Sequence, residues 1–244
     1  MRVRCEPEEP LNTATLFDAT RPLIVEAPDS PYPYFLGGAG FIAIYENMGA
    51  FITAAHVVRN LNPTDFLILP HDSNIGLPLT SMMVPKSGID ADDVAVFPFD
   101  LSKAEADAPR LREHSLPLGD MVVGRGGSAL AAGASLEAAA CPGETCAIDY
   151  DVRQISAKTL TLNLEYLAPD AQRKYLHRAA LKPRADLASW AGISGSPVYA
   201  FNPPSFGFVG MIVEAGGEIC HFIDSSRIYA IIRRIHSDII SGAV

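Results

Sequence analysis

The stretch that decides the fold is Gly192-Ile193-Ser194-Gly195-Ser196-Pro197-Val198. It places a serine between two glycines and continues into residues that are typical of a β-strand. Two earlier segments carry a histidine and an aspartate, whose acid–base chemistry complements the serine hydroxyl. Phe51-Ile52-Thr53-Ala54-Ala55-His56 ends in a histidine, and Asp93-Val94-Ala95-Val96-Phe97 begins with an aspartate. Along the chain, the candidate catalytic residues therefore occur in the order His56, Asp93, Ser194.

This order distinguishes between unrelated folds that assemble the same three side chains. An α/β-hydrolase orders them Ser, Asp, His and needs Gly-X-Ser-X-Gly between a strand and a helix. Here position 196 is a serine, and the residues after it favour a strand. The order His, Asp, Ser belongs to the chymotrypsin-like double barrel. The chain thus resembles the trypsin-like (chymotrypsin-fold) serine proteases at its three catalytic segments and at the strand after Ser194.

Length and composition agree with such a fold. Of the 244 residues, 48% are hydrophobic and 19% are charged, which is ample for a buried core. The 19 prolines and 19 glycines separate short apolar runs, as in proteins built from many strands joined by turns. The resemblance implies an all-β fold of two six-stranded antiparallel β-barrels, followed by a C-terminal α-helix.

The boundary between the barrels is expected in segment 102–115, whose Ala, Glu, Lys, Arg and Leu suit a linker with a helical turn. Residues 1–115 would then contain an N-terminal arm (1–30) and the first barrel, and residues 116–244 the second barrel and the helix. Together they would form one trypsin-like peptidase domain. Asp224 and two serines are expected to cap the helix, whose isoleucines recur at helical spacing. The expected strands are 35–45, 50–53, 66–70, 79–84, 94–99, 119–124, 129–140, 147–155, 160–167, 196–201, 206–214 and 218–223.

The acidic balance of the chain argues against several classes of partner. Its 19 Lys and Arg against 28 Asp and Glu give a formal net charge of −9, without the basic surface that nucleic acid requires. No apolar stretch is long enough to cross a bilayer, and residues 1–10 lack the apolar core of a secretion signal. We therefore expect a cytoplasmic protein with no nucleic-acid and no membrane partner.

Cysteine usage points the same way, because Cys5, Cys141, Cys146 and Cys220 are few for a secreted protease of this type. Cys141 and Cys146 could close a small disulfide loop or supply two metal ligands. No second Cys/His pair at zinc spacing accompanies them, so reduced thiols are the favoured interpretation. We expect neither a metal nor another cofactor.

The expected catalytic roles follow from the chemistry of three side chains. A serine hydroxyl is a poor nucleophile at neutral pH, so Ser194 needs a base, and His56 is the residue with a suitable pKa. Asp93 would orient the imidazole and stabilise its protonated form. Asp92 is its near rival. The resemblance favours Asp93, because Asp93-Val94-Ala95-Val96 matches the family pattern of Asp, hydrophobic, Ala, hydrophobic.

The resemblance further implies an oxyanion hole formed by the amides of Gly192 and Ser194. Ile193 departs from the family pattern, since digestive and clotting enzymes have Asp immediately before the serine. That Asp normally pairs with an amino terminus freed by cleavage. Ile193 therefore argues against zymogen activation of that kind.

The specificity pocket is also placed by resemblance. Ala188 would lie near its base with Ser189 beside it, and the uncharged base favours a small or medium apolar substrate side chain over Arg or Lys. The Gly-Ser-Pro-Val ending resembles a bacterial intracellular, glutamyl-endopeptidase-like branch, although segment 211–213 lacks the histidine that those enzymes have. Glu214 could point into the pocket and favour a basic residue, or it could be a solvated strand-end residue. The residues expected along the wall are Val213, Glu214, Ala215 and Gly216.

These features predict a serine endopeptidase that hydrolyses peptide bonds of proteins through an acyl-enzyme. Its activity would be restricted by a narrow cleft, by a regulatory protein partner, or by a distorted oxyanion loop that a partner corrects. The alternative is a catalytically silent binding module that retains the protease fold. An esterase that uses the same triad is a third hypothesis.

Overall fold

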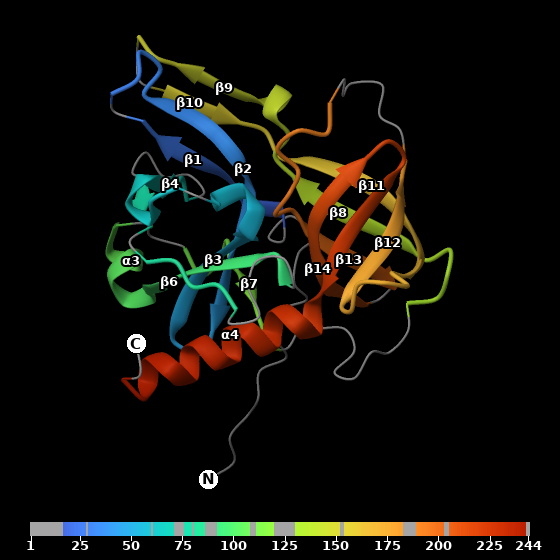
Figure 1. The fold of residues 1–244 in the computed structure, drawn as a ribbon. Helices are drawn as coiled ribbons and strands as arrows, with labels where there is room; N and C mark the ends of the chain where they lie inside the picture. The colour runs from blue at the N-terminus through green and yellow to red at the C-terminus, as the bar shows by residue number, and fades with distance from the viewer. Residues whose placement is uncertain are drawn as a thin grey trace.

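The computed structural model describes residues 17–27, 29–59, 61–70, 76–79, 81–85, 92–107, 111–119, 130–151, 154–182, 189–202 and 205–242, without the side chains of 201–206. The chain forms two β-units side by side, with one long helix beneath them (Figure 1). Three short 3-10 helices and one short α-helix connect the strands: η1 (Ala55–Val58), η2 (Pro63–Asp65), η3 (Gly143–Thr145) and α3 (Leu101–Asp107).

The first unit is a seven-stranded sheet in which β7 pairs in parallel with β2 and all other neighbours are antiparallel. β2 and β3 correspond to the expected strands 35–45 and 50–53 and pair as a hairpin, and β6 lies beside β3. The strand order is β5 (Leu77–Pro78), β4 (Phe66–Ile68), β1 (Thr20–Glu26), β2 (Tyr34–Tyr45), β3 (Met48–Ala54) and β6 (Val94–Asp100), with β7 (Leu116–Pro117) off this path.

The second unit is a closed antiparallel barrel of six strands. The all-β class and this closed barrel are as predicted, but the first unit is an open half-barrel over the residues that the structure describes. Around the barrel the strands are β11 (Leu160–Pro169), β12 (Leu176–Leu181), β15 (Ile219–Asp224), β14 (Ser205–Gly216), β13 (Pro197–Asn202) and β8 (Ser135–Ala140).

The N-terminal arm was the largest error of the sequence prediction. Within it, Thr20–Glu26 forms β1, which pairs with β2 on one side and β4 on the other. Leu23, Ile24 and Val25 are at most 2% exposed. A short apolar run can be a fully buried strand, and its partners lie too far along the chain for local pattern to reveal them.

Other differences arise where local chemistry interrupts a strand. Over its described residues, the predicted strand 79–84 forms a single bridge, Met83 with Val96. The flanking Pro78 and Pro85 have no amide hydrogen with which to extend the pairing. The predicted strand 147–155 is a hairpin, β9 (Cys146–Asp149) with β10 (Gln154–Ala157), in which Asp149 accepts the amide of Asp151 at 3.0 Å. Strand β12 was not predicted, and predicted strand 119–124 lies almost entirely outside the described residues.

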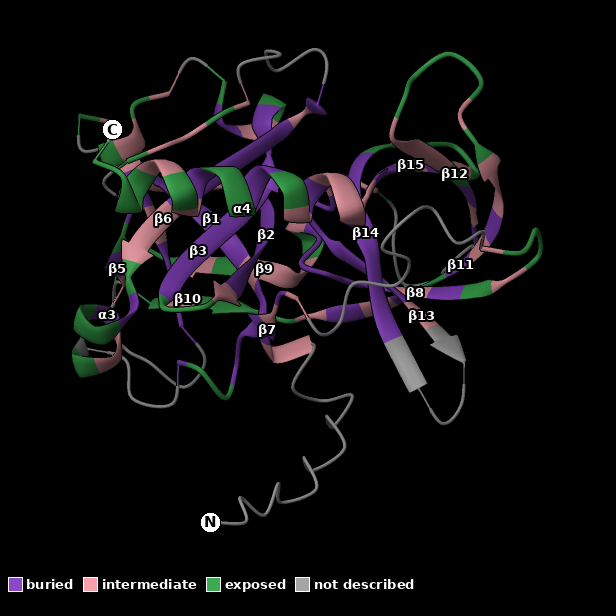
Figure 2. Ribbon diagram, turned by 90° about the horizontal axis from the view of Figure 1, so that it is seen from below, coloured by how far each residue is buried: buried purple, intermediate pink, exposed green. Residues whose placement is uncertain are grey.

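Helix α4 (Ser225–Ile240) joins the two units. Its cap is as predicted, because the Asp224 side chain accepts the Ser226 amide at 2.7 Å. Four of its isoleucines are buried in a cluster with residues of both units, whereas Ile239 and Ile240 are exposed. Figure 2 shows the exposed outer face of the helix with the buried strands behind it. The buried isoleucines are Ile228, Ile231, Ile232 and Ile235.

Two of the described cysteines are buried and poorly reactive. Cys141, Cys146 and Cys220 are free thiols. Burial raises the pKa of Cys141 to about 11 and that of Cys220 to about 12, so both are protonated at neutral pH and poorly nucleophilic. The described residues contain no group of three or more His, Cys, Asp or Glu side chains arranged to hold a metal ion.

Over the described ranges, no helix is both long and apolar enough to span a membrane.

Candidate active site

His56 and Asp93 are joined by two hydrogen bonds. His56 lies in η1, directly after β3, and Asp93 lies one residue before β6, which pairs with β3. The Asp93 carboxylate is 2.8 Å from Nδ1 of the imidazole through one oxygen, and it accepts the backbone amide of His56 at 2.8 Å through the other. This contact fixes the ring and leaves Nε2 as the nitrogen that can act as a base.

The backbone at Asp93 is held in an uncommon conformation. Its φ of +43° lies in the left-handed region, which Asp tolerates better than most residues. The Asp93 carbonyl accepts the Ala55 amide at 3.1 Å. The neighbouring carboxylate, Asp92, is 3% exposed and pairs with Arg227 instead of with His56. Of the two carboxylates considered, the structure therefore brings only Asp93 to the imidazole.

The loop that carries Ser194 is docked between the two units. The Ser194 carbonyl accepts the Ala39 amide of β2 at 3.0 Å, and the Gly195 amide donates to Ile212 of β14 at 2.8 Å. Gly195 has a φ of +96°, and a Cβ there would overlap the Ala39 carbonyl. Glycine is therefore required at this position, because the backbone of β2 passes directly against the loop.

Among the described residues, no acceptor pairs with the two amides expected to form the oxyanion hole. Over the described residues, neither the Gly192 amide nor the Ser194 amide donates a hydrogen bond. Gly192 has a φ of +88°. Ile193 is 1% exposed and packs into the core of the second barrel. Ile193, which stands where the resemblance led us to expect Asp, thus anchors the loop by apolar burial.

The Ser194 hydroxyl donates to the Val213 carbonyl, with an oxygen-to-oxygen distance of 3.4 Å. Within the described part of the chain, it makes no hydrogen bond to His56. Catalytic hydrogen bonds are often long or misaligned in the absence of substrate and tighten only when it binds. A rotation about one side-chain bond would redirect this hydroxyl.

The residues predicted to bind substrate have different environments. Ala188 lies outside the described residues, and the Ser189 hydroxyl accepts the Ala191 amide at 3.1 Å. The Val213 side chain is buried, and its backbone carbonyl accepts the hydrogen bond from the Ser194 hydroxyl. Ala215 is half-buried, and Gly216 is exposed at the end of β14.

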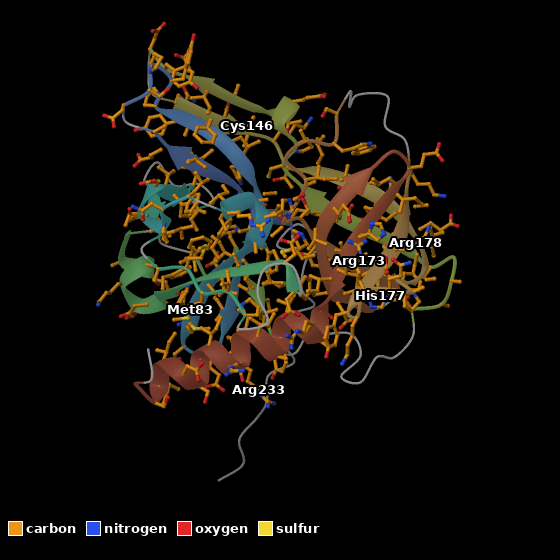
Figure 3. The ribbon with its side chains drawn as sticks, viewed as in Figure 1. Met83, Cys146, Arg173, His177, Arg178 and Arg233 are labelled. Carbon is orange, nitrogen blue, oxygen red and sulfur yellow. The ribbon has the colours of Figure 1, made fainter. Side chains whose placement is uncertain are left out.

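Glu214 is engaged in a charged cluster on the surface of the second barrel. Its carboxylate is 2.9 Å from a guanidinium nitrogen of Arg173 and 3.6 Å from Nδ1 of His221. Arg173 also contacts Asp170 at 3.4 Å, and Figure 3 labels it on this barrel. Arg173 holds the pKa of Glu214 below its ordinary value. Glu214 is therefore a paired carboxylate at neutral pH.

Charge around the imidazole favours its protonated form. The hydrogen bond that the imidazole donates to Asp93 is the main cause that raises the pKa of His56 above 6.5, burial opposes it, and the charges of Asp93 and Glu214 add to the rise. The imidazole is 44% exposed, so it is accessible to a reactant.

Comparison with solved structures decides the fold. Human heparin binding protein aligns with a TM-score of 0.62 over 96% of this chain and 96% of its own, at 12% identity. The fold is the chymotrypsin-like double barrel. An inactivated protease paralogue of the scabies mite has the same double barrel, with a TM-score of 0.58, 12% identity and coverage of 93% of this chain and 98% of its own.

At this identity, the likeness establishes the chymotrypsin-like architecture alone. No family model matches the chain, and no curated protein matches its sequence. The narrower resemblance to glutamyl endopeptidases stays a prediction. Within the double barrel, His56 and Asp93 come from the first unit and Ser194 from the second.

Sequence reasoning missed Arg173 and Arg227, which pair with Glu214 and Asp92. Their partners lie 41 and 135 residues away along the chain. No local pattern links such distant residues. The acidic residues could have prompted a search for cations, but only the assembled barrels select which cation each one meets.

Proposed function

We propose that this protein is a serine endopeptidase that hydrolyses peptide bonds through Ser194, His56 and Asp93. Ser194 Oγ would attack the scissile carbonyl carbon while Nε2 of His56 takes the hydroxyl proton. The imidazolium would then give that proton to the leaving amine as the C–N bond breaks. Water would release the acyl group from Ser194 by the same steps with His56 again as base.

Two features of the site would lower the barriers to these steps. Asp93 would stabilise the imidazolium, because its carboxylate already accepts from both the ring and the backbone of His56. The amides of Gly192 and Ser194, which donate to no described residue, would stabilise the oxyanion. The observation that carries the proposal is the double contact of Asp93 with His56. The loop that carries Ser194 is held by backbone contacts with β2 and β14.

The proposal is tested by intact-mass detection of covalent labelling with a fluorophosphonate, which reports an activated serine without knowledge of the substrate. The wild-type protein should gain one adduct, and the Ser194→Ala variant should gain none. Profiling with a peptide library would then give the cleavage preference. A wild-type protein that stays unlabelled would contradict an assembled, active triad.

We expect the labelling rate to rise with pH through a midpoint above 6.5, because His56 must be neutral to accept a proton and its pKa is raised. Activity is thus lost as pH falls through this raised pKa. Rates measured between about pH 5 and 8 would give the midpoint. In Glu214→Gln, the loss of one negative charge should move the midpoint to lower pH. A midpoint that is unchanged in this variant would refute the role of Glu214.

The second candidate function is a non-catalytic binding module. The orientation of the Ser194 hydroxyl toward Val213 favours it, and one structural neighbour is itself an inactivated protease paralogue. Such a module would remain unlabelled under all conditions. A protease held inactive until a regulatory partner binds would become labelled only with that partner. Turnover of small esters without peptide cleavage would instead identify an esterase.

A further inference from the structure

A buried ion pair joins helix α4 to the segment that carries Asp93. The guanidinium of Arg227, in the first turn of the helix, donates to both oxygens of Asp92 at 2.7 and 2.6 Å. The Asp92 side chain is 3% exposed and that of Arg227 is 26% exposed. This two-point contact is the geometry in which an arginine fixes the orientation of a carboxylate as well as its position.

Asp92 is covalently next to the residue whose placement matters most for the imidazole. Asp93 has a left-handed backbone and contacts His56 through both oxygens of its side chain. Uncommon backbone conformations persist where the surroundings hold them from several directions. Directly after Asp93 in the chain, β6 pairs with β3. Directly before it, Asp92 forms an ion pair with Arg227.

Arg227 is itself held by the second barrel. Its guanidinium lies 5.0 Å from the centre of the Tyr175 ring, and the Tyr175 carbonyl accepts the Asp224 amide at 2.8 Å. The Asp224 side chain caps the helix and is 3.2 Å from Nε2 of His177 in β12. The arginine that binds Asp92 is thus held by the same barrel that carries Ser194.

We propose that Arg227 is a positioning residue that acts through Asp92 to hold Asp93, and therefore His56, in register with the nucleophile loop. The proposal rests on the proposed function of His56 and Asp93. It assigns α4 a role beyond covering the sheet: its first turn links the barrel that holds the nucleophile to the carboxylate that orients the base.

The test is the double variant Asp92→Asn/Arg227→Met, which removes the ion pair without a change in net charge. The pKa of His56 would be measured by NMR titration, with its signal assigned from a His56→Gln variant. We expect the pKa of His56 to fall toward 6.5 and the fluorophosphonate labelling rate to drop about tenfold to a hundredfold. Asp93 and Glu214, the charged groups that act on His56, are both retained in this variant.

Charge and geometry predict opposite results for the single variant Arg227→Met. Loss of a cation beside Asp92 would, by charge alone, raise the pKa of His56. A fall in that pKa would therefore identify lost geometry. The matched control is Arg234→Met, which removes an exposed arginine of the same helix whose ion pair with Asp238 spans 3.8 Å, and it should match the wild type.

A folded double variant with the control's His56 pKa and labelling rate would overturn the proposal. If the double variant does not fold, Arg227→Lys replaces the two-point grip by a point charge. It should still lower both quantities, and wild-type values would overturn the proposal. Because NMR reports the pKa of His56 without turnover, a protein that never labels would contradict the proposed function while the positioning role remains testable.

Discussion

Replacing Asp93 by asparagine should lower the rate of fluorophosphonate labelling about 10⁴-fold while the protein stays folded. The carboxylate accepts two hydrogen bonds from His56, one from the ring and one from the backbone. An asparagine has one acceptor oxygen. If that oxygen keeps the backbone amide, its NH₂ group faces Nδ1 and favours the tautomer with the proton on Nε2, which cannot accept the proton of Ser194.

The measurement is the second-order labelling rate at a pH above the midpoint of the wild-type profile, with circular dichroism to verify the fold. Asp100→Asn is the matched control, because Asp100 is an exposed carboxylate at the other end of β6 that caps α3. Its labelling rate should equal that of the wild type. An Asp93→Asn rate within about tenfold of the wild type would mean that Asp93 does not set the tautomer of His56.

The variant Gly195→Ala should lose more than about 4 kcal/mol of unfolding free energy or fail to fold. Gly195 has a φ of +96°, and an added Cβ would overlap the Ala39 carbonyl and lie 2.7 Å from the Thr53 hydroxyl. Neither neighbour can move freely. Thr53 donates to the Ala39 carbonyl at 2.6 Å, and the Ala39 amide donates to Ser194 at 3.0 Å.

Urea unfolding separates the steric clash from the backbone strain when Gly133→Ala is measured beside it. Gly133 also has a left-handed backbone, with a φ of +84°, but an added Cβ would meet no atom within 4 Å. Only the strain of about 1–2 kcal/mol is expected there. Equal losses in the two variants would refute the close packing of the nucleophile loop against β2.

Asp93 and Gly195 act on different parts of the candidate active site. Asp93 orients the base within the first unit, whereas Gly195 lets the loop from the second unit lie directly against β2. The Ser194 loop is therefore placed by backbone contacts with both units. Its catalytic use depends on side-chain contacts that the backbone alone does not supply.

Several elements of the fold were predicted from local sequence patterns. Two apolar runs separated by turn residues 46–49 predicted β2 and β3, and Asp224 followed by two serines predicted the start of α4. The order of His56, Asp93 and Ser194 indicated the double barrel. These signals lie within a few residues of the structure that they predict, so composition and spacing express them directly.

Elements whose stability comes from strands far away in the sequence were not predicted. β1 was interpreted as an arm and β12 was missed, because each is defined by strands that pair with it from elsewhere in the chain. Over the described residues of segment 79–84, a single bridge at Met83 stands where a continuous strand was expected.

The chemical groups of the candidate site, their order along the chain and the positions that need glycine are all evident in the sequence. The partners of those groups are not: folding brings Asp93 to His56, Asp92 to Arg227, Glu214 to Arg173, and the Ser194 hydroxyl to Val213. The difference lies in the distance along the chain over which each interaction acts. Backbone preference and apolar periodicity act between near neighbours, whereas an ion pair or a catalytic hydrogen bond joins atoms that only the packing of the two barrels brings together.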